Sequence, residues 1–157
     1  MKRQIATSSK IIHAPAHKIY EIIADYRTSH PLILPKPYFL SLHVEEGGVG
    51  EGTIVNFTMR LLGRTQSFRS LITEPEPGRA IVETDIQSGT PTTFRVLPLA
   101  GDAQTKVTIS TELVNRGAVE GVLGKLMLQK IYRAELELLA GLAEKQMAMT
   151  QAATKAQ

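Results

Sequence analysis

The sequence contains no cysteine and no tryptophan among its 157 residues, and only 5% of its residues are aromatic. Without cysteine the chain can form no disulfide, no thiolate nucleophile and no thiolate metal site. The eight aromatic residues, four phenylalanines and four tyrosines, are too few to predict a stacking platform for single-stranded nucleic acid. The composition therefore favours a protein of a reducing compartment with no nucleic-acid partner.

Long apolar runs and runs of like charge are also missing. No apolar segment approaches the ~18 residues of a membrane span, and no apolar stretch follows the charged residues Lys2 and Arg3 as it would in a signal peptide. The net charge is +3, but the basic residues alternate with acidic ones, as is typical of an ordinary solvated surface. We expect a cytoplasmic protein without an integral membrane segment.

The length and composition are those of one globular domain. A chain of 157 residues with 43% hydrophobic and 21% charged residues can bury a core of its own without a metal or a disulfide. We expect a single domain over residues 1–146, followed by a polar, alanine-rich tail over 147–157 that frays.

Two periodicities divide the chain. Alternating apolar residues predict a strand over 2–12, and a helix is expected from about Pro15 to Asp25 because proline suits the first helical position. The next stretch is irregular, with at most one helical turn before residue 35. Six strands joined by short turns are then expected over 38–46, 53–62, 65–73, 79–86, 92–98 and 105–114. After Asn115 the period becomes that of a helix of about 30 residues.

The hairpin turns predict the strand registers. A two-residue turn at Gly63-Arg64 places Phe57 opposite Ser70. A turn at Ser88-Gly89 places Phe94 opposite Glu83, and a turn over 100–102 places Phe94 opposite Ile109. All three registers gather apolar side chains on one face of the sheet, as a half-buried antiparallel sheet requires.

This apolar face needs a cover, and the long C-terminal helix is the element available. Its apolar stripe runs from Val119 to Leu142, and a curved sheet packed on one helix leaves space for a ligand between them. We predict that the cavity is lined by Phe57, Met59, Phe68, Ser70, Ile81, Glu83, Phe94, Val96, Ile109, Thr111, Leu123, Met127 and Ile131.

Glu83 is the polar residue of most interest in this set. Inside the cavity it would have to be paired, protonated or hydrated, and it could orient a ligand hydroxyl or act as a general base. With a different loop length it would instead point into solvent. Polar tips at the rim of the cavity are expected from Tyr20, Tyr26, His30, Tyr38 and Tyr132.

The four histidines do not form a metal-binding pattern. His13 and His17 are four residues apart, but the Ala14-Pro15 break separates them, so we expect no metal site.

The order of elements and three short motifs resemble the START-like, or helix-grip, superfamily (SRPBCC), and within it the polyketide cyclase/dehydrase-like group. The motifs are the strand–Ala-Pro–helix segment 12–25, Glu74-Pro75, and Thr105-Lys106-Val107, and the resemblance extends over about residues 3–145. It implies an α+β helix-grip fold, with a seven-stranded curved antiparallel sheet around a long C-terminal helix, in the order β-α-α-β6-α.

The resemblance also implies the function to expect, which is binding or transport of a small apolar ligand such as a lipid, an isoprenoid or a polyketide-like molecule. It implies no cofactor and leaves the oligomeric state open. One alternative is an enzyme of the polyketide cyclase or dehydratase type that uses the same cavity. A second alternative is a protein-partner module like the chaperone activators of the superfamily, which would need a large exposed apolar patch.

Overall fold

The strands among the described residues pair antiparallel in one seven-stranded sheet, in the spatial order β1-β7-β6-β5-β4-β3-β2. The computed structural model describes residues 3–113 and 118–157; the predicted strand ends at residues 2 and 114 lie outside them. Strands β2 to β7 form a meander, and β1 adds to its far edge by pairing with β7. The strands are β1 (Gln4–Ile12), β2 (Phe39–Glu46), β3 (Ile54–Leu61), β4 (Arg64–Glu76), β5 (Ala80–Asp85), β6 (Pro91–Leu99) and β7 (Gln104–Leu113).

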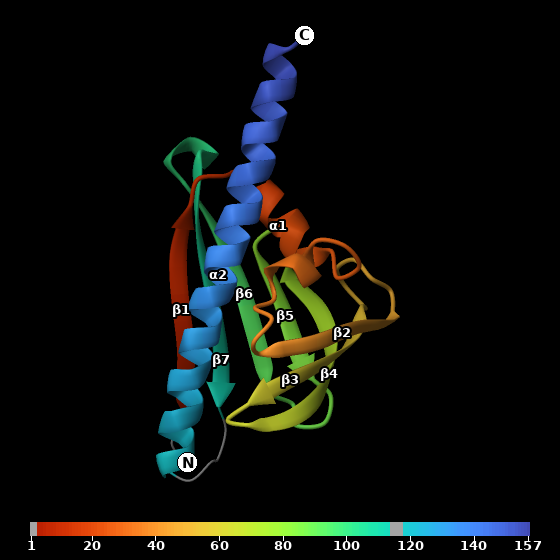
Figure 1. The fold of residues 1–157 in the computed structure, drawn as a ribbon, viewed down its shortest axis with the longest axis vertical. Helices are drawn as coiled ribbons and strands as arrows, with labels where there is room; N and C mark the ends of the chain where they lie inside the picture. The colour runs from red at the N-terminus through yellow and green to blue at the C-terminus, as the bar shows by residue number, and fades with distance from the viewer. Residues whose placement is uncertain (1–2, 114–117) are drawn as a thin grey trace.

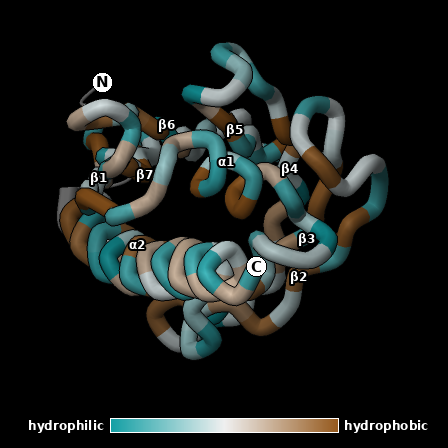
Figure 2. The backbone as a smooth tube through the Cα atoms, turned by 90° about the horizontal axis from the view of Figure 1, so that it is seen from above, coloured by the Kyte–Doolittle hydropathy of each residue, from teal (hydrophilic) through white to brown (hydrophobic). Residues whose placement is uncertain are grey.

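The sheet is strongly curved, and the C-terminal helix α2 (Ala118–Lys155) closes its open side (Figure 1). Seen from above, the strands follow an arc from β1 to β2, with α2 across the arc and α1 (Ala16–Ala24) above its interior (Figure 2). This arrangement is the predicted helix-grip fold, with one difference in the helices. The second helix expected before β2 is the short 3-10 turn η1 (His30–Ile33).

Helix α1 begins at Ala16, one residue later than predicted, because Pro15 is extended and occupies the N-cap position. No local side chain caps it; instead the carboxylate of Asp102, in the short 3-10 turn η2 (Ala100–Asp102) between β6 and β7, accepts a hydrogen bond of 2.9 Å from the Ala16 N–H. An acidic side chain at a helix N-terminus accepts a hydrogen bond from a free N–H, and its negative charge interacts favourably with the positive end of the helix dipole. The β6–β7 hairpin thus fixes where α1 starts.

The apolar stripe predicted over Val119 to Leu142 was widened by Leu128, Tyr132, Leu136 and Leu139 in the sequence, and only part of it is buried. Ile131, Tyr132, Leu136 and Leu139 are buried as predicted, but other members of the stripe face solvent. Leu123 is 50% exposed and Leu138 is 41% exposed, while the side chain of Val119 lies outside the described residues. A glutamate within the buried face makes that face a poorer apolar stripe by sequence than the neighbouring face, which explains the error. The buried residues of α2 are Ile131, Tyr132, Glu135, Leu136, Leu139, Ala140 and Ala143.

The tail that was expected to fray is helical. Helix α2 continues through Lys155 and extends beyond the end of the sheet (Figure 1). This segment is rich in alanine and also contains methionine and glutamine, which favour helix even without packing. Among the described residues, no helix has both the length and the hydropathy to cross a membrane.

The predicted register of the first hairpin is offset by two residues. The turn is at Leu62-Gly63, both with positive φ (50° and 75°), which is the pattern of a type I′ hairpin turn. Phe57 therefore lies opposite Phe68 rather than opposite Ser70. An offset of two keeps every side chain on its predicted face, so the apolar face was assigned correctly.

The β5–β6 hairpin is also offset by two, and the β6–β7 register is confirmed. Glu83 lies opposite Thr92 and Phe94 opposite Ile81, because the loop spans residues 86–89 instead of two residues. Phe94 lies opposite Ile109 as predicted. The common apolar face of the sheet is thereby confirmed, and its fully buried members form the core with α1 and α2.

Candidate functional site

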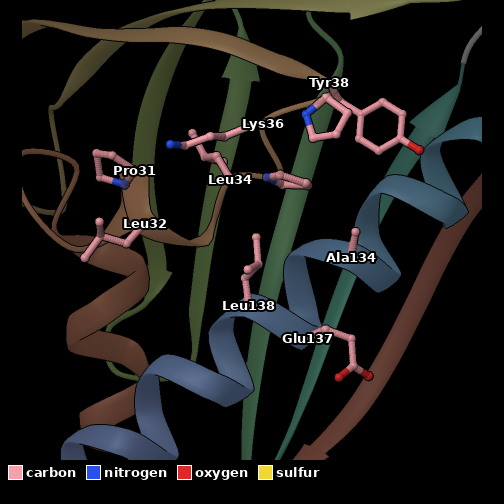
Figure 3. Close-up of a pocket in the computed structure, with 10 residues that line it drawn as sticks. Pro31, Leu32, Leu34, Lys36, Tyr38, Ala134, Glu137 and Leu138 are labelled. Atoms are coloured by element: carbon pink, nitrogen blue, oxygen red, sulfur yellow. The ribbon is translucent and has the colours of Figure 1, made fainter.

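A groove of about 630 Å³ opens between the segment 31–38 and helix α2. The segment contributes three prolines and two leucines, and α2 contributes Ala134, Glu137 and Leu138. Figure 3 shows these side chains on the two walls, with Leu138 directed toward the proline-rich segment and the strands of the sheet behind. Polar groups are confined to a few positions, including Lys36 and Tyr38, so the groove is an apolar surface with polar edges.

The proline content of segment 31–38 explains why a groove forms here. Proline fixes φ and has no N–H, so the segment neither continues a helix nor adds a strand to the sheet before β2 begins. Ala134 on the facing helix is small and partly buried, which leaves the space between the walls unfilled. The groove is thus a consequence of local sequence on both sides.

A cluster of polar side chains lies inside the molecule, between the sheet and the helices. It begins at Tyr26, which is fully buried and donates a hydrogen bond of 2.7 Å to Oε1 of Glu83. The ring of His30 stacks on Tyr26 with 4.3 Å between centroids. Nε2 of His30 lies 3.6 Å from the same Oε1. Residues from the α1–η1 region and from β5 therefore meet at one carboxyl group.

His30 is held as a neutral imidazole. Burial lowers its pKa to about 4, and Nδ1 lies 2.7 Å from the carbonyl oxygen of Ile23. A neutral ring can make this bond only by donating its Nδ1–H, so Nε2 carries a lone pair toward Glu83. The site therefore contains no histidine cation to neutralise the carboxylate.

The carboxyl group of Glu83 has a pKa near neutrality. Its side chain is 12% exposed, and burial raises its pKa from 4.5 to about 7, against the opposing effect of the hydrogen bond from Tyr26. A carboxyl group with a pKa near neutrality can both accept and donate a proton. The hypothesis that Glu83 points inward thus agrees with the register and with its burial.

Glu135 is a second buried carboxyl group, and the sequence analysis missed it. It is 2% exposed, and its pKa is raised well above the ordinary value by burial and by the charge of Glu83. Among the described residues, no hydrogen bond or ion pair to its carboxyl group is found. A usable signal was present, because Glu135 follows Ile131 by four residues and precedes Leu139 by four, so all three share one helix face.

A chain of hydroxyl groups completes the cluster. The Thr111 hydroxyl is hydrogen-bonded both to the Tyr132 hydroxyl and, at 2.6 Å, to the Thr92 hydroxyl. Burial raises the pKa of Tyr132 to about 12, so it remains a neutral donor. The cluster therefore offers neutral hydroxyl groups beside two carboxyl groups, and its members come from the α1–η1 region, three strands and α2.

The predicted site residues divide into three sets. On the sheet, all the predicted residues lie on the inner face, with Phe68 and Glu83 partly buried and the others buried. On α2, Ile131 is buried, Met127 packs partly against the core and Leu123 points to solvent. The groove is lined mainly by residues that were not predicted, with the exception of Tyr38.

The other expected rim tyrosines lie elsewhere. Tyr26 and Tyr132 are inside the polar cluster, and Tyr20 donates to Glu74 at 2.6 Å. No group of three or more His, Asp or Glu residues within the described ranges is arranged to hold a metal ion.

Solved structures with this fold include the KanY protein, determined by NMR, which superposes with a TM-score of 0.80 at 25% sequence identity over 92% of this chain and 99% of that protein. The ZhuI aromatase/cyclase of Streptomyces sp. R1128 gives a TM-score of 0.76 at 17% identity, over 93% of this chain and 96% of that one. A START superfamily protein of Mycobacterium smegmatis gives 0.67 at 16% identity, over 90% and 97%.

Sequence comparison gives a family but no individual relative. No curated protein is similar enough in sequence to count as a match. The family model for polyketide cyclase/dehydrase and lipid transport proteins matches residues 3–144, a range that contains all seven described strands and the part of α2 that covers them. The chain belongs to the polyketide cyclase/dehydrase and lipid transport family.

Proposed function

We propose that this protein binds a small, largely apolar molecule that enters through the groove between segment 31–38 and α2. The apolar groove of about 630 Å³ carries the proposal, because small-molecule sites are concave, mostly apolar and of this size. The family, whose description includes lipid transport, supports the same class of ligand. The polar end of the ligand would be directed to the cluster of Glu83 and Glu135.

The position of the cluster favours this orientation. Ala134 and Leu138 line the groove, and Glu135 lies on the same helical turn but faces the interior. His30 adjoins Pro31 in the chain, so the turn η1 borders both the groove and the cluster. A ligand with its apolar body in the groove would direct its polar group past η1 toward these carboxyl groups.

The test uses a neutral fluorescent apolar dye, Nile red, and a substitution that fills the groove. Ala134→Trp should weaken dye binding at least tenfold, because the indole occupies the space between the walls. Ala148→Trp, at an exposed position of the same helix, is the matched control and should bind as the wild type does. Equal binding by all three proteins would show that the groove is not the entrance.

A catalytic role is the second candidate, and the protonation state of Glu83 is the observation that favours it. A carboxyl group whose pKa is about 7 is suited to take a proton from an activated carbon and return it to a leaving hydroxyl group. Incubation with a β-hydroxy ketone probe, followed by mass spectrometry, would detect loss of water. The activity should disappear in Glu83→Gln. If the wild type shows no turnover, the catalytic role is excluded for this probe and binding remains as the proposed function.

A further inference from the structure

The two buried carboxyl groups come from opposite walls of the interior. Glu83 belongs to β5 and Glu135 to α2. Glu83 lies opposite Thr92 in the sheet, and the hydrogen bonds from Thr92 through Thr111 to Tyr132 lead from there to the turn of α2 that carries Glu135. In agreement with this proximity, the charge of Glu83 raises the pKa of Glu135. The groups around them are Tyr26 and His30 from the α1–η1 region, and Tyr132 from α2. In the part of the chain that the structure describes, no lysine or arginine forms an ion pair with either carboxyl group.

The hydrogen bonds of the cluster do not satisfy these two groups. Glu83 accepts one bond, from Tyr26, although a carboxylate has room for about four. The neutral His30 presents a lone pair to it and not a donor. Glu135 is 2% exposed and meets no donor among the described residues. Both carboxyl groups therefore face the interior with acceptor capacity that the protein leaves unused.

An unpaired buried carboxyl group lowers stability, whether it is ionised or protonated. A core position on α2 would be filled more favourably by leucine, as at Leu136 and Leu139 on the same face. The presence of two such groups together, without a cation, indicates that the missing partner is supplied from outside the chain. That partner must offer several donors or a positive charge.

We propose that the ligand is an organic amine, with its ammonium group between Glu83 and Glu135 and its apolar body in the groove. An ammonium group has three N–H donors and a positive charge, so it would satisfy both carboxylates and remove the repulsion between them. A hydroxyl group has one donor and leaves that repulsion in place. The inference rests on the proposed function, because it assumes that ligands enter through the groove.

Binding of an ammonium group is coupled to proton release. Because the pKa of Glu83 is about 7 and that of Glu135 is raised well above its ordinary value, one or both are protonated near neutral pH. The incoming cation stabilises the ionised forms, so the protons leave. The affinity for an amine should therefore rise between pH 6 and pH 8, whereas the affinity for a neutral ligand should not.

The experiment compares two probes with the same apolar body, naphthalen-1-ylmethylamine and naphthalen-1-ylmethanol. Isothermal titration of the full-length protein at pH 8 should show the amine bound at least tenfold more tightly than the alcohol. The preference should shrink as the pH falls to 6. Repeating the titration in buffers of different ionisation enthalpy should show net proton release with the amine alone.

Two variants locate the effect. Glu135→Gln keeps the shape of the side chain but not its charge, and it should reduce the amine preference at least fivefold while alcohol binding persists. Glu144→Gln, on an exposed turn of the same helix, is the matched control and should retain the preference. Circular dichroism establishes that each variant is folded, and the probe comparison on the wild type stands even if Glu135→Gln does not fold.

The outcomes separate this inference from the proposed function. If both probes bind equally, or the alcohol binds more tightly, the amine inference is overturned while ligand binding in the groove stands. If neither probe binds and Nile red does not bind either, the proposed function fails and the amine inference fails with it. If Nile red binds and neither naphthalene probe does, the amine inference alone is overturned.

Discussion

Two tyrosine–glutamate pairs connect the α1 region to the sheet, and they differ in how fully the glutamate is satisfied. Tyr20 donates to Glu74 at 2.6 Å, and Glu74 also accepts a hydrogen bond of 2.9 Å from the backbone N–H of Glu51. Tyr26 donates to Glu83 at 2.7 Å, but the next polar neighbour of Glu83 is the unprotonated nitrogen of His30.

The comparison shows how the same two residue types can serve different ends. The Tyr20 pair lies at the partly exposed edge of the core, where Glu74 also holds the loop at Glu51 in place. The Tyr26 pair lies in the interior, beside a second carboxyl group that has no partner among the described residues. The first pair fixes structure, and the second leaves acceptors free for a ligand. Four predictions test this distinction.

The largest effect is expected in the pH dependence of stability. The pKa of Glu83 in the folded state is raised from 4.5 to about 7, so its contribution is present below pH 4.5 and is lost as the pH rises to 7. Chemical unfolding at several pH values should show that the stability of the wild type relative to Glu83→Gln falls by about 3 kcal/mol over this interval. A difference independent of pH would contradict the assignment.

His30 has the opposite dependence and supplies the internal control. Its pKa is lowered from 6.5 to about 4, so its contribution is present above pH 6.5 and is lost as the pH falls to 4. In the wild type the two dependences oppose each other. In Glu83→Gln the dependence of His30 should become visible as a loss of stability on acidification.

The next effect concerns Glu135, whose replacement by leucine should stabilise the protein. Glu135→Leu removes a buried carboxyl group that has no donor among the described residues and should raise the free energy of unfolding by about 1–3 kcal/mol. The gain should be larger at pH 8 than at pH 5, because the pKa of Glu135 is raised in the folded state, so that above pH 4.5 the unfolded chain releases this proton more readily than the folded chain does. Urea denaturation measures both values, and Gln146→Leu, at an exposed position of the same helix, should change stability little.

Glu74→Leu should have the opposite sign. It removes the acceptor of the Glu51 N–H and of the stronger hydrogen bond of Tyr20, which retains only the 3.3 Å contact with the carbonyl oxygen of Ala80. We expect a loss of about 1–2 kcal/mol in the same urea experiment. A gain in stability would mean that the two glutamates are equivalent and that the distinction is wrong.

The smallest effect distinguishes Tyr26 from Tyr20 by the pKa of Glu83 and not by the free energy of unfolding. Tyr26→Phe removes the one donor of Glu83, whose hydrogen bond lowers the pKa of that carboxyl, so the pKa should rise above 7. Carbon-detected NMR titration of the Glu83 side chain would measure it. Tyr20→Phe should leave that pKa unchanged, and both substitutions should cost about 1 kcal/mol of stability.

The sequence was sufficient for the fold because its signals are periodic and redundant. Alternation assigned Phe57, Phe68 and Phe94 to one face even where the turn was placed two residues away. These phenylalanine assignments hold because an offset of two preserves the parity of each strand. For Glu83 the sequence left two positions open, inside the cavity or in solvent, and only the structure shows that its side chain is buried.

The site could be predicted only in part, for identifiable reasons. Choosing the most hydrophobic stripe of α2 excluded Glu135, although it lies on the buried face. The groove depends on how segment 31–38 crosses in front of α2, and three prolines in an irregular segment do not determine that path. Sequence periodicity describes elements one at a time, whereas the groove belongs to the space between two of them.

The two offset hairpins also have an evolutionary consequence. An insertion inside β4 or β5 would send every following side chain of that strand to the other face, whereas a residue gained in the turns at the tips of β3–β4 and β5–β6 leaves the strand pairs in place. Homologues should therefore differ in length at these tips and not within the strands, unless a bulge absorbs the extra residue. Loop length can change there while the lining of the interior, including Glu83, is inherited unchanged.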